Sequence, residues 1–369
     1  MDVIRTSARV GAGFVGGGFM AAVHSRAARA ARAELRAASS STAQRGRAAA
    51  ELLGIETPYA DLAELLADPG VDVVHICSPN ATHAEFALAA LDAGKHVVCE
   101  KPLATTVADA ELLAARAAER GLVATVPFVY RYHPMVREAR DRVARGETGR
   151  LLTFTGSYLQ DWLLDGADDN WRVDASLGGP SRAFADIGSH LCDLVEFVTG
   201  DRIARLVATS RTVFQERAEH RDIDTEDAVA LVVETRSGAI GTLTVSQVAP
   251  GRKNRLAIEL AGARESLGFD QEQPETLWVG RREGDLVLRR DPATLSPAAA
   301  RLSIVPAGHP MGYQDAFTAF VDDTYALMRG EHRDGVPTFA DGLRAVRITE
   351  AVLRSAATRS WVEIPEEEA

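Results

Sequence analysis

The sequence is poor in cysteine and lacks long apolar runs. Its three cysteines, Cys77, Cys99 and Cys192, are far apart and form no CxxC pair. We therefore expect neither a disulfide framework nor a cysteine-built zinc site, and we predict a reducing compartment, the cytoplasm. No window reaches the roughly 18 uninterrupted apolar residues that span a bilayer, so no membrane partner is expected.

Positive charge is also scarce. The chain has 41 Lys+Arg against 52 Asp+Glu, a formal net charge of −11. Nucleic-acid binding needs clustered basic residues, and the arginines within 26–36 lie among alanines with no interleaved aromatics, as on a solvated helix face. We expect no nucleic-acid partner. With 46% hydrophobic and 25% charged residues, the 369-residue chain is typical of a globular protein of two domains.

Two patterns of secondary structure divide the chain. The first third alternates short β-rich runs with alanine-rich helical runs, which predicts an α/β domain with a doubly wound parallel sheet over residues 1–127. From about residue 151, many strands follow with few helices between them. This predicts an α+β domain over 128–369 with a large, mainly antiparallel open sheet. The first domain's strands are expected at 9–15, 34–39, 71–77, 95–99 and 123–128.

Glycines crowd the junction of the first strand and first helix. Residues 11–16 match G-x-G-x-x-G, and residues 16–21 match G-x-G-x-x-A. The second register is favoured because the first would begin the helix with glycines, which are poor helix formers. A bare turn lets backbone N–H groups at a helix N-terminus approach a pyrophosphate, as in Rossmann domains. The residues expected to bind a dinucleotide here are Gly16, Gly18, Phe19 and Met20; a plain glycine-rich turn is the alternative.

No carboxylate follows the second strand. Rossmann domains that bind NAD place Asp or Glu there, on the ribose 2′-hydroxyl. This chain instead has Ser40, Ser41 and Thr42, followed by Arg45. Hydroxyls beside an arginine suit the 2′-phosphate of NADP, so NADP is favoured, with NAD or dual use open. The alternative is that Ser and Thr only cap the next helix.

Polar residues follow two later strands at the sheet edge that faces the ligand crevice. Lys101 comes directly after the strand at 95–99, and Pro102, if cis, would fix its direction. We expect Lys101 to project toward the cofactor; a surface lysine beside a turn proline is the alternative. Asn80 is expected to touch the cofactor, and His83 to cap the following helix. The expected cofactor-binding set at these ends is Ser78, Pro79, Asn80, His83, Glu100 and Lys101.

A carboxylate and an imidazole lie four residues apart in the predicted helix at 186–199. Asp186 and His190 would share one helix face, and such a pair suits general acid–base catalysis. An ordinary surface pair is one alternative. A metal site with Asp193 is another, but no second His lies near, so we expect no metal.

The motifs occur together in an order that identifies a family. They are Gly16-Gly17-Gly18-Phe19-Met20 with His24, Ser78-Pro79-Asn80 with His83, Glu100-Lys101-Pro102, and Asp186-x-Gly-x-His190-x-x-Asp193. From the first strand to Gly312-Tyr313, the chain resembles the glucose–fructose oxidoreductase/inositol dehydrogenase (Gfo/Idh/MocA) family. The Glu-Lys-Pro and Asp-x3-His motifs are specific to it, whereas the glycine motif is not. The missing acidic residue and Ala21 at the third glycine depart from the family pattern.

The resemblance implies a function. Family members oxidise a secondary alcohol of a sugar or cyclic polyol with a nicotinamide dinucleotide, or reduce the ketone. By resemblance, Lys101 contacts substrate and nicotinamide ribose, His190 transfers the proton, and Asp186 binds a neighbouring hydroxyl. The C-terminal sheet would cover the sugar and form homodimers or homotetramers. Two alternatives remain open: a nicotinamide-dependent glycosidase of the same architecture, and a non-catalytic NAD(P)-binding sensor.

Further polar and aromatic residues are predicted to line the substrate cleft. A flat aromatic ring beside hydrogen-bonding groups grips the apolar face and the hydroxyl rim of a sugar. Packing in the core is the alternative for the two tryptophans among them. The expected set, besides Lys101, Asp186 and His190, is Tyr130, Arg131, Tyr158, Gln160, Trp162, Trp171 and Arg172.

Overall fold

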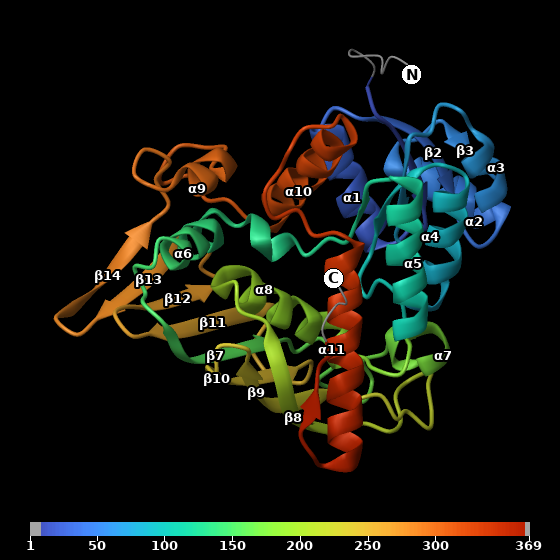
Figure 1. Ribbon diagram of the computed structural model, residues 1–369. Helices are drawn as coiled ribbons and strands as arrows, with labels where there is room; N and C mark the ends of the chain where they lie inside the picture. Colours follow the sequence, from blue (N-terminus) through green and yellow to red (C-terminus); the bar gives the residue numbers. More distant parts are fainter. Residues whose placement is uncertain (1–8, 366–369) are drawn as a thin grey trace. The chain divides into compact units, whose positions relative to one another are not determined.

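The computed structural model describes residues 9–365 and divides them into two compact units (Figure 1). The first unit comprises the chain up to Ala104 together with Ala108–Pro127 and Phe317–Gly342. The second comprises Thr105–Val107, Phe128–Ala316 and the chain from Leu343 onward. One boundary therefore lies between residues 127 and 128.

The segment Phe317–Gly342 departs from the predicted division, which assigned everything after residue 127 to the second domain. It packs into the first unit instead. The Val126 N–H donates to Pro337 O at 3.1 Å, and Thr125 forms an antiparallel bridge with Thr338. These contacts place the segment beside the last strand of the first unit. Because the paired positions lie about 200 residues apart, no local sequence pattern predicts the contact.

The first unit is built on six strands in the order β3-β2-β1-β4-β5-β6. All its pairings are parallel, as predicted. The order reverses between β1 and β4, and ligands of such sheets bind outside the carboxyl ends at this switch point. The strands are β1 (Gly11–Val15), β2 (Glu34–Ser39), β3 (Thr57–Pro58), β4 (Val73–Ile76), β5 (His96–Cys99) and β6 (Ala124–Thr125).

Alanine-rich helices cover this sheet. In the first of them Ala21, Ala27 and Ala28 are buried, and such small side chains let the helix approach the strands closely. Residues from 317 onward add a further helix to the unit. The helices are α1 (Phe19–Ala30), α2 (Ala43–Leu53), α3 (Leu62–Ala67), α4 (His83–Asp92), α5 (Val107–Arg120) and α10 (Tyr313–Met328).

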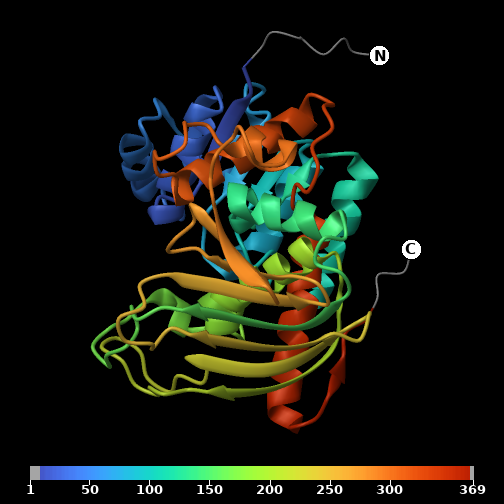
Figure 2. The same ribbon diagram turned by 90° about the vertical axis from the view of Figure 1, so that its left-hand side faces the viewer.

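The second unit contains one curved sheet of nine strands in the order β14-β13-β12-β11-β7-β10-β9-β8-β15 (Figure 2). Its neighbours are antiparallel except β7 and β10, which are parallel. The prediction of a large, mainly antiparallel sheet is confirmed. The strands are β7 (Leu151–Leu159), β8 (Ile203–Arg211), β9 (Ala228–Thr235), β10 (Ile240–Ser246), β11 (Arg255–Gly262), β12 (Ser266–Asp270), β13 (Thr276–Arg281), β14 (Gly284–Arg289) and β15 (Val362–Glu363).

One face of this sheet holds the core of the second unit. Side chains alternate along β7, where Phe154 and Tyr158 are buried beneath the helices while Thr155 between them is exposed. The helices of this unit are α6 (Pro134–Ala144), α7 (Ala175–Gly178), α8 (Ser189–Thr199), α9 (Pro297–Leu302) and the main part of α11 (Phe339–Thr358). Among the described residues, no helix is long and apolar enough to cross a membrane.

Candidate functional site

The glycine-rich turn of the first unit joins β1 to α1. The strand ends at Val15 and the helix begins at Phe19 with Gly18 as its N-cap, so the second register is the one used. Gly16 has φ +107°, and a Cβ there would lie 2.6 Å from Cys77 O. Its N–H donates to Ser39 O at 2.9 Å. The turn is therefore held between the ends of β2 and β4 and has no room for a side chain at its first glycine.

The other end of the turn is open. A Cβ at Gly18 would have no heavy atom within 4 Å, and no side chain of the described residues caps the helix there. The Phe19 side chain is 73% exposed. The first N–H groups of α1 thus keep their hydrogen-bonding capacity and the positive end of the helix dipole, which suits a pyrophosphate.

The end of β2 carries the serine, threonine and arginine predicted to meet a ribose phosphate. Thr42 Oγ1 accepts from the Arg45 N–H at 3.2 Å, so Thr42 does cap α2. The Arg45 guanidinium donates to Ser41 Oγ at 3.1 Å, and both side chains are exposed. Capping explains Thr42, whereas the exposed Ser41–Arg45 pair is left available to a ligand.

The His83 ring ties two strand-end loops together. Its Nδ1 lies 2.7 Å from Pro102 O and its Nε2 lies 3.0 Å from Ser78 O. The side chain is fully buried, and burial lowers the pKa of the ring despite these carbonyl partners. The His83 side chain has no exposed surface, so its predicted place in the cofactor-binding set stays a prediction. It braces the loops that carry Asn80 and Lys101.

Glu100 and Lys101 follow β5, and the Lys101–Pro102 peptide bond is cis. The buried Glu100 carboxylate accepts from His24 Nε2 at 2.9 Å and from the Lys101 N–H at 3.2 Å. Burial acts to raise the pKa of Glu100, but the hydrogen bond from His24 and the nearby positive charges outweigh it and hold that pKa below its ordinary value. The carboxylate is therefore ionised.

The proposed acid–base pair of the second unit lies at the start of α8. Asp186 belongs to a π-helical turn, Phe184–Gly188, and His190 to the first α-helical turn after it. The helix thus begins two residues earlier than predicted and with a wider turn, a feature frequent at functional sites. Residues 9–365 contain no group of three His, Cys, Asp or Glu side chains arranged for a metal.

Three aromatic rings surround the His190 imidazole, which is 7% exposed. Phe128 and Tyr130 meet it edge-on with centroids at 5.5 and 5.1 Å, and Tyr158 lies at 6.4 Å. The two tyrosine hydroxyls are hydrogen-bonded to each other. Burial raises the pKa of both phenols, so they remain neutral donors beside the ring.

Asn254 closes a ring of hydrogen bonds with these tyrosines. Tyr158 donates to Asn254 Oδ1 at 2.8 Å, and Asn254 Nδ2 donates to Tyr130 at 3.2 Å. Gln160 Nε2 also donates to Asn254 Oδ1 at 2.8 Å, and the Trp162 indole donates to Gln160 Oε1 at 2.7 Å. Four of the residues predicted to bind substrate are therefore connected through an asparagine that sequence reasoning missed.

A second network fixes Asp186. Gln247 Nε2 donates to Asp186 Oδ2 at 2.8 Å, and the Gln247 oxygen accepts from the buried Arg182 at 3.3 Å. Arg182 in turn pairs with Asp227. The Arg172 guanidinium lies 3.6 Å from Asp186. Gln247 was also missed, although a polar residue directly after a strand was the available signal.

The remaining predicted residues differ in their surroundings. Arg131 forms a bidentate ion pair with Asp193 and packs on the Phe197 ring at 4.9 Å. Its guanidinium is thus engaged by the Asp193 carboxylate and the Phe197 ring. Trp171 stacks under the Arg172 guanidinium at 4.5 Å, which places it beside the group that reaches Asp186.

Comparisons with known proteins agree with both halves. The family profile described as an oxidoreductase family with an NAD-binding Rossmann fold matches residues 10–128, and that of the GFO/IDH/MocA C-terminal domain matches residues 136–267. Levoglucosan dehydrogenase of Pseudarthrobacter phenanthrenivorans is 30% identical over 96% of this chain and 98% of its own length. The chain belongs to the Gfo/Idh/MocA oxidoreductase family.

Solved structures also match over nearly the whole chain. An oxidoreductase domain protein from Kribbella flavida has a TM-score of 0.90 at 38% identity, covering 98% of this chain and 100% of its own. Levoglucosan dehydrogenase in complex with NADH and L-sorbose has a TM-score of 0.91 at 30% identity, covering 98% of this chain and 100% of its own. An Azotobacter vinelandii inositol dehydrogenase homolog with NADH and myo-inositol has a TM-score of 0.86 at 29% identity, covering 97% of this chain and 98% of its own.

The turn glycines provide a matched pair of variants. Gly16→Ala should lower the free energy of unfolding by about 1–3 kcal/mol, because its backbone lies at positive φ against Cys77 O. Gly18→Ala should change it by less than about 0.5 kcal/mol, since its Cβ meets open space, yet weaken dinucleotide binding by about tenfold or more. Urea unfolding and fluorescence titration with NADH and NADPH measure both. If Gly18→Ala bound the dinucleotide as tightly as the wild type, the assignment of this turn to the cofactor site would be contradicted.

Proposed function

We propose that this protein transfers a hydride between a nicotinamide dinucleotide and a secondary alcohol or ketone of a sugar, glycoside or cyclic polyol. The observation that carries the proposal is the His190 imidazole among three aromatic rings, at the start of the helix whose preceding turn carries Asp186. Rings beside hydroxyl, amide and carboxylate groups form the surface that a sugar needs. One of the relatives named above is a levoglucosan dehydrogenase, and the inositol dehydrogenase homolog was solved with NADH and myo-inositol.

Each side chain has one step in this reaction. His190 takes the proton of the reacting hydroxyl in oxidation and returns it in reduction. Asp186, held by Gln247, binds a neighbouring hydroxyl and orients the ring. Lys101 steadies the negative charge that develops on the reacting oxygen. When bound, the nicotinamide supplies the hydride acceptor or donor.

The cofactor is held by the first unit. Gly16 and Gly18 form the turn that accommodates a pyrophosphate, with the uncapped N-terminus of α1 behind it. Ser41 and Arg45 lie exposed where the adenine ribose of such a fold lies. A guanidinium and hydroxyls with no carboxylate favour a ribose 2′-phosphate, so our proposal specifies NADP as the preferred form.

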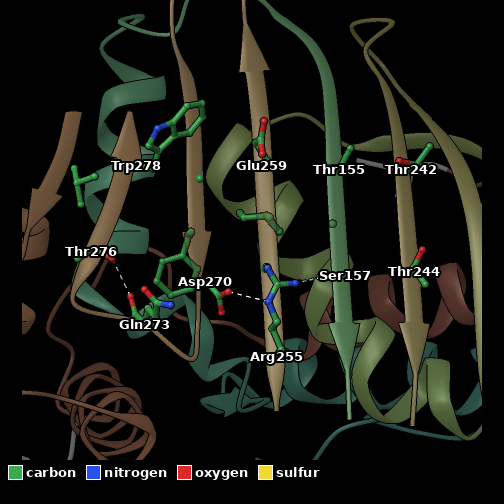
Figure 3. A pocket seen from close by; sticks show the side chains of 16 residues that line it. Thr155, Ser157, Thr242, Thr244, Arg255, Glu259, Asp270, Gln273, Thr276 and Trp278 are labelled. Atoms are coloured by element: carbon green, nitrogen blue, oxygen red, sulfur yellow. Dashed lines mark hydrogen bonds and ion pairs between the residues drawn. The ribbon is translucent and has the colours of Figure 1, made fainter. Parts of the chain in front are cut away.

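We also infer a homo-oligomer, a dimer or tetramer, through the open face of the second unit's sheet. Figure 3 shows small polar side chains on this face, among them Thr155, Ser157, Thr242 and Thr244. They line a hollow of about 580 Å³ beside Trp278. A solvated sheet face ordinarily carries many charges, whereas this one is mostly threonine, serine and small residues, which suits close packing against another sheet.

The few charges on this face come in both signs. Arg255 pairs with Asp270 at 2.9 Å and donates to Ser157 at 3.2 Å, while Glu259 stands exposed nearby (Figure 3). A symmetric dimer brings the same patch of two copies together, so a patch that contains both signs can complement itself. We therefore take a second copy of this chain as the occupant of the face. Three free cysteines support the cytoplasm as its compartment.

The catalytic assignment is tested by His190→Ala. Loss of a general base typically costs about 10²–10⁴-fold in rate, so turnover with a panel of sugars, glycosides and inositols should collapse while NADP binding persists. His220→Ala, which removes an imidazole paired with Asp169, is the control and should keep its rate. Cleavage of a glycoside without net reduction of the cofactor would favour a glycosidase. If the wild type turned over none of the substrates, a non-catalytic sensor would be favoured.

Cofactor choice is tested by Arg45→Ala. Loss of one charge-assisted contact to a phosphate at an exposed position should raise the KM for NADP by about tenfold and leave the KM for NAD within about twofold. Arg47→Ala, at an exposed position on the same helix, is the matched control. Equal effects of Arg45→Ala on both cofactors would contradict a 2′-phosphate contact.

The oligomer is tested by two negative charges placed in the centre of the proposed interface. Thr155 and Thr242 are exposed partners on β7 and β10, so Thr155→Glu with Thr242→Glu buries like charges in the interface. Light scattering should show the mass fall to that of one chain, 39.5 kDa. Ala118→Glu on α5, also exposed, should leave the mass unchanged. A wild type that is already monomeric would refute the interface.

A further inference from the structure

A chain of four buried side chains runs through the core of the first unit. Tyr325 of α10 lies with its hydroxyl 2.7 Å from His75 Nε2 of β4. His75 Nδ1 lies 2.9 Å from His24 Nδ1 of α1, and His24 Nε2 lies 2.9 Å from Glu100 Oε1. The exposed fractions of Tyr325, His75 and His24 are 0%, and that of Glu100 is 5%. No step proposed above for the reaction uses Tyr325, His75 or His24.

The ionised carboxylate at one end fixes the first hydrogen bond of the chain. Glu100 can only accept, so His24 Nε2 carries a hydrogen and donates to it. The two ring nitrogens of His75 lie within hydrogen-bond distance of His24 Nδ1 and of the Tyr325 hydroxyl. Burial keeps the pKa of His75 well below its ordinary value, which agrees with a neutral ring there. A neutral ring has one donor and one acceptor nitrogen, so His75 continues the hydrogen-bond chain from Tyr325 to His24.

The chain ends at the backbone of Lys101. Glu100 Oε2 accepts from the Lys101 N–H at 3.2 Å, and on the other side of the lysine Pro102 O lies 2.7 Å from His83 Nδ1. The main chain of Lys101 is thus held before and after its side chain. Aromatic rings close around the chain, since Phe14 stacks on His75 at 4.9 Å.

We propose that Tyr325, His75 and His24 are positioning residues for Lys101. They orient the Glu100 carboxylate, and through its second oxygen they set where the lysine leaves the end of β5. Because the same chain joins α10, β4 and α1, it fixes the lysine to the elements that carry the cofactor turn. The inference rests on the proposed role of Lys101 at the reacting oxygen.

The test is Tyr325→Phe, which removes one hydroxyl and keeps the ring. His75 Nε2 loses its hydrogen-bond partner, and the carboxylate is no longer held by a complete chain. We expect kcat to fall about tenfold, as small misplacements of catalytic groups do, with the Kd for NADP within twofold. Glu100→Gln should lower kcat further than Tyr325→Phe does, because its amide has only one oxygen to accept from two donors, the His24 Nε2–H and the Lys101 N–H.

The matched control is Thr324→Val. It deletes a neighbouring buried hydroxyl of α10 that bonds Phe320 O at 3.0 Å and lies 3.3 Å from Thr125 Oγ1. Its loss of thermal stability should equal that of Tyr325→Phe, while its kcat should stay that of the wild type. Equal kcat losses in Tyr325→Phe and Thr324→Val would mean that Tyr325 acts only through stability, and would overturn the proposal.

A double-mutant cycle with Lys101→Met separates positioning from structure. If Tyr325 acts through Lys101, Tyr325→Phe should reduce kcat about tenfold in the wild type and less than twofold when Lys101 is methionine. A full tenfold loss in both backgrounds would overturn the positioning role. Unchanged turnover in Lys101→Met alone would instead overturn the role proposed for the lysine and, with it, the inference built on it.

Discussion

A charged carboxylate in a protein interior must be surrounded by donors, and this requirement shapes both units. Leaving such a group unpaired costs several kcal/mol, far more than any single apolar contact contributes. In the first unit the carboxylate is Glu100, with His24 and the Lys101 N–H as donors. In the second it is Asp227, whose oxygens accept from Arg182, Arg217 and two backbone N–H groups. Around each, the core is polar where an apolar core would pack as well.

Each of these networks ends on a residue proposed for the reaction. From Asp227 it runs through Arg182 and Gln247 to Asp186, and from Glu100 it reaches the backbone of Lys101 directly. A chain of satisfied hydrogen bonds resists small displacements, because moving one member breaks two bonds. The buried charge thus serves to place a side chain at the surface of its unit, which explains why polar cores are kept here.

Much of the fold could be predicted because periodicity and turn residues are local. The strand Glu34–Ser39 follows the predicted bounds. The helix α6 escaped prediction since Arg137 and Glu138 are buried among its apolar residues, which hides the amphipathic pattern. The strands β3 and β15 have two residues each, too few for any period. The return of residues 317–342 to the first unit depends on contacts far apart in sequence.

The residues of the candidate site that lie in sequence motifs could be predicted, whereas the residues that hydrogen-bond to them could not. Lys101, Asp186 and His190 stand in recognisable spacings, whereas Asn254 and Gln247 have no motif. Both lie at the sheet edge where β7 ends, because Leu159 pairs with Ser246 on one side and with Arg255 on the other. Only the register of three strands brings these amides together. The burial of His83 between two loops could not be predicted for a related reason, because it cannot be read from the sequence of one loop.

The basic residues show a division of labour that net charge conceals. Lys95, Lys101 and Lys253 are the only lysines of the sequence, so nearly all of its 41 basic residues are arginine. Interior ion pairs such as Arg182–Asp227 use the planar guanidinium, which donates to several acceptors at once. A compact ammonium suits a different task, the stabilisation of charge on a single oxygen, which is the role proposed for Lys101. A chain of net charge −11 can hold an anionic cofactor for the same reason, because a helix end and a few placed cations decide binding, and the total charge does not.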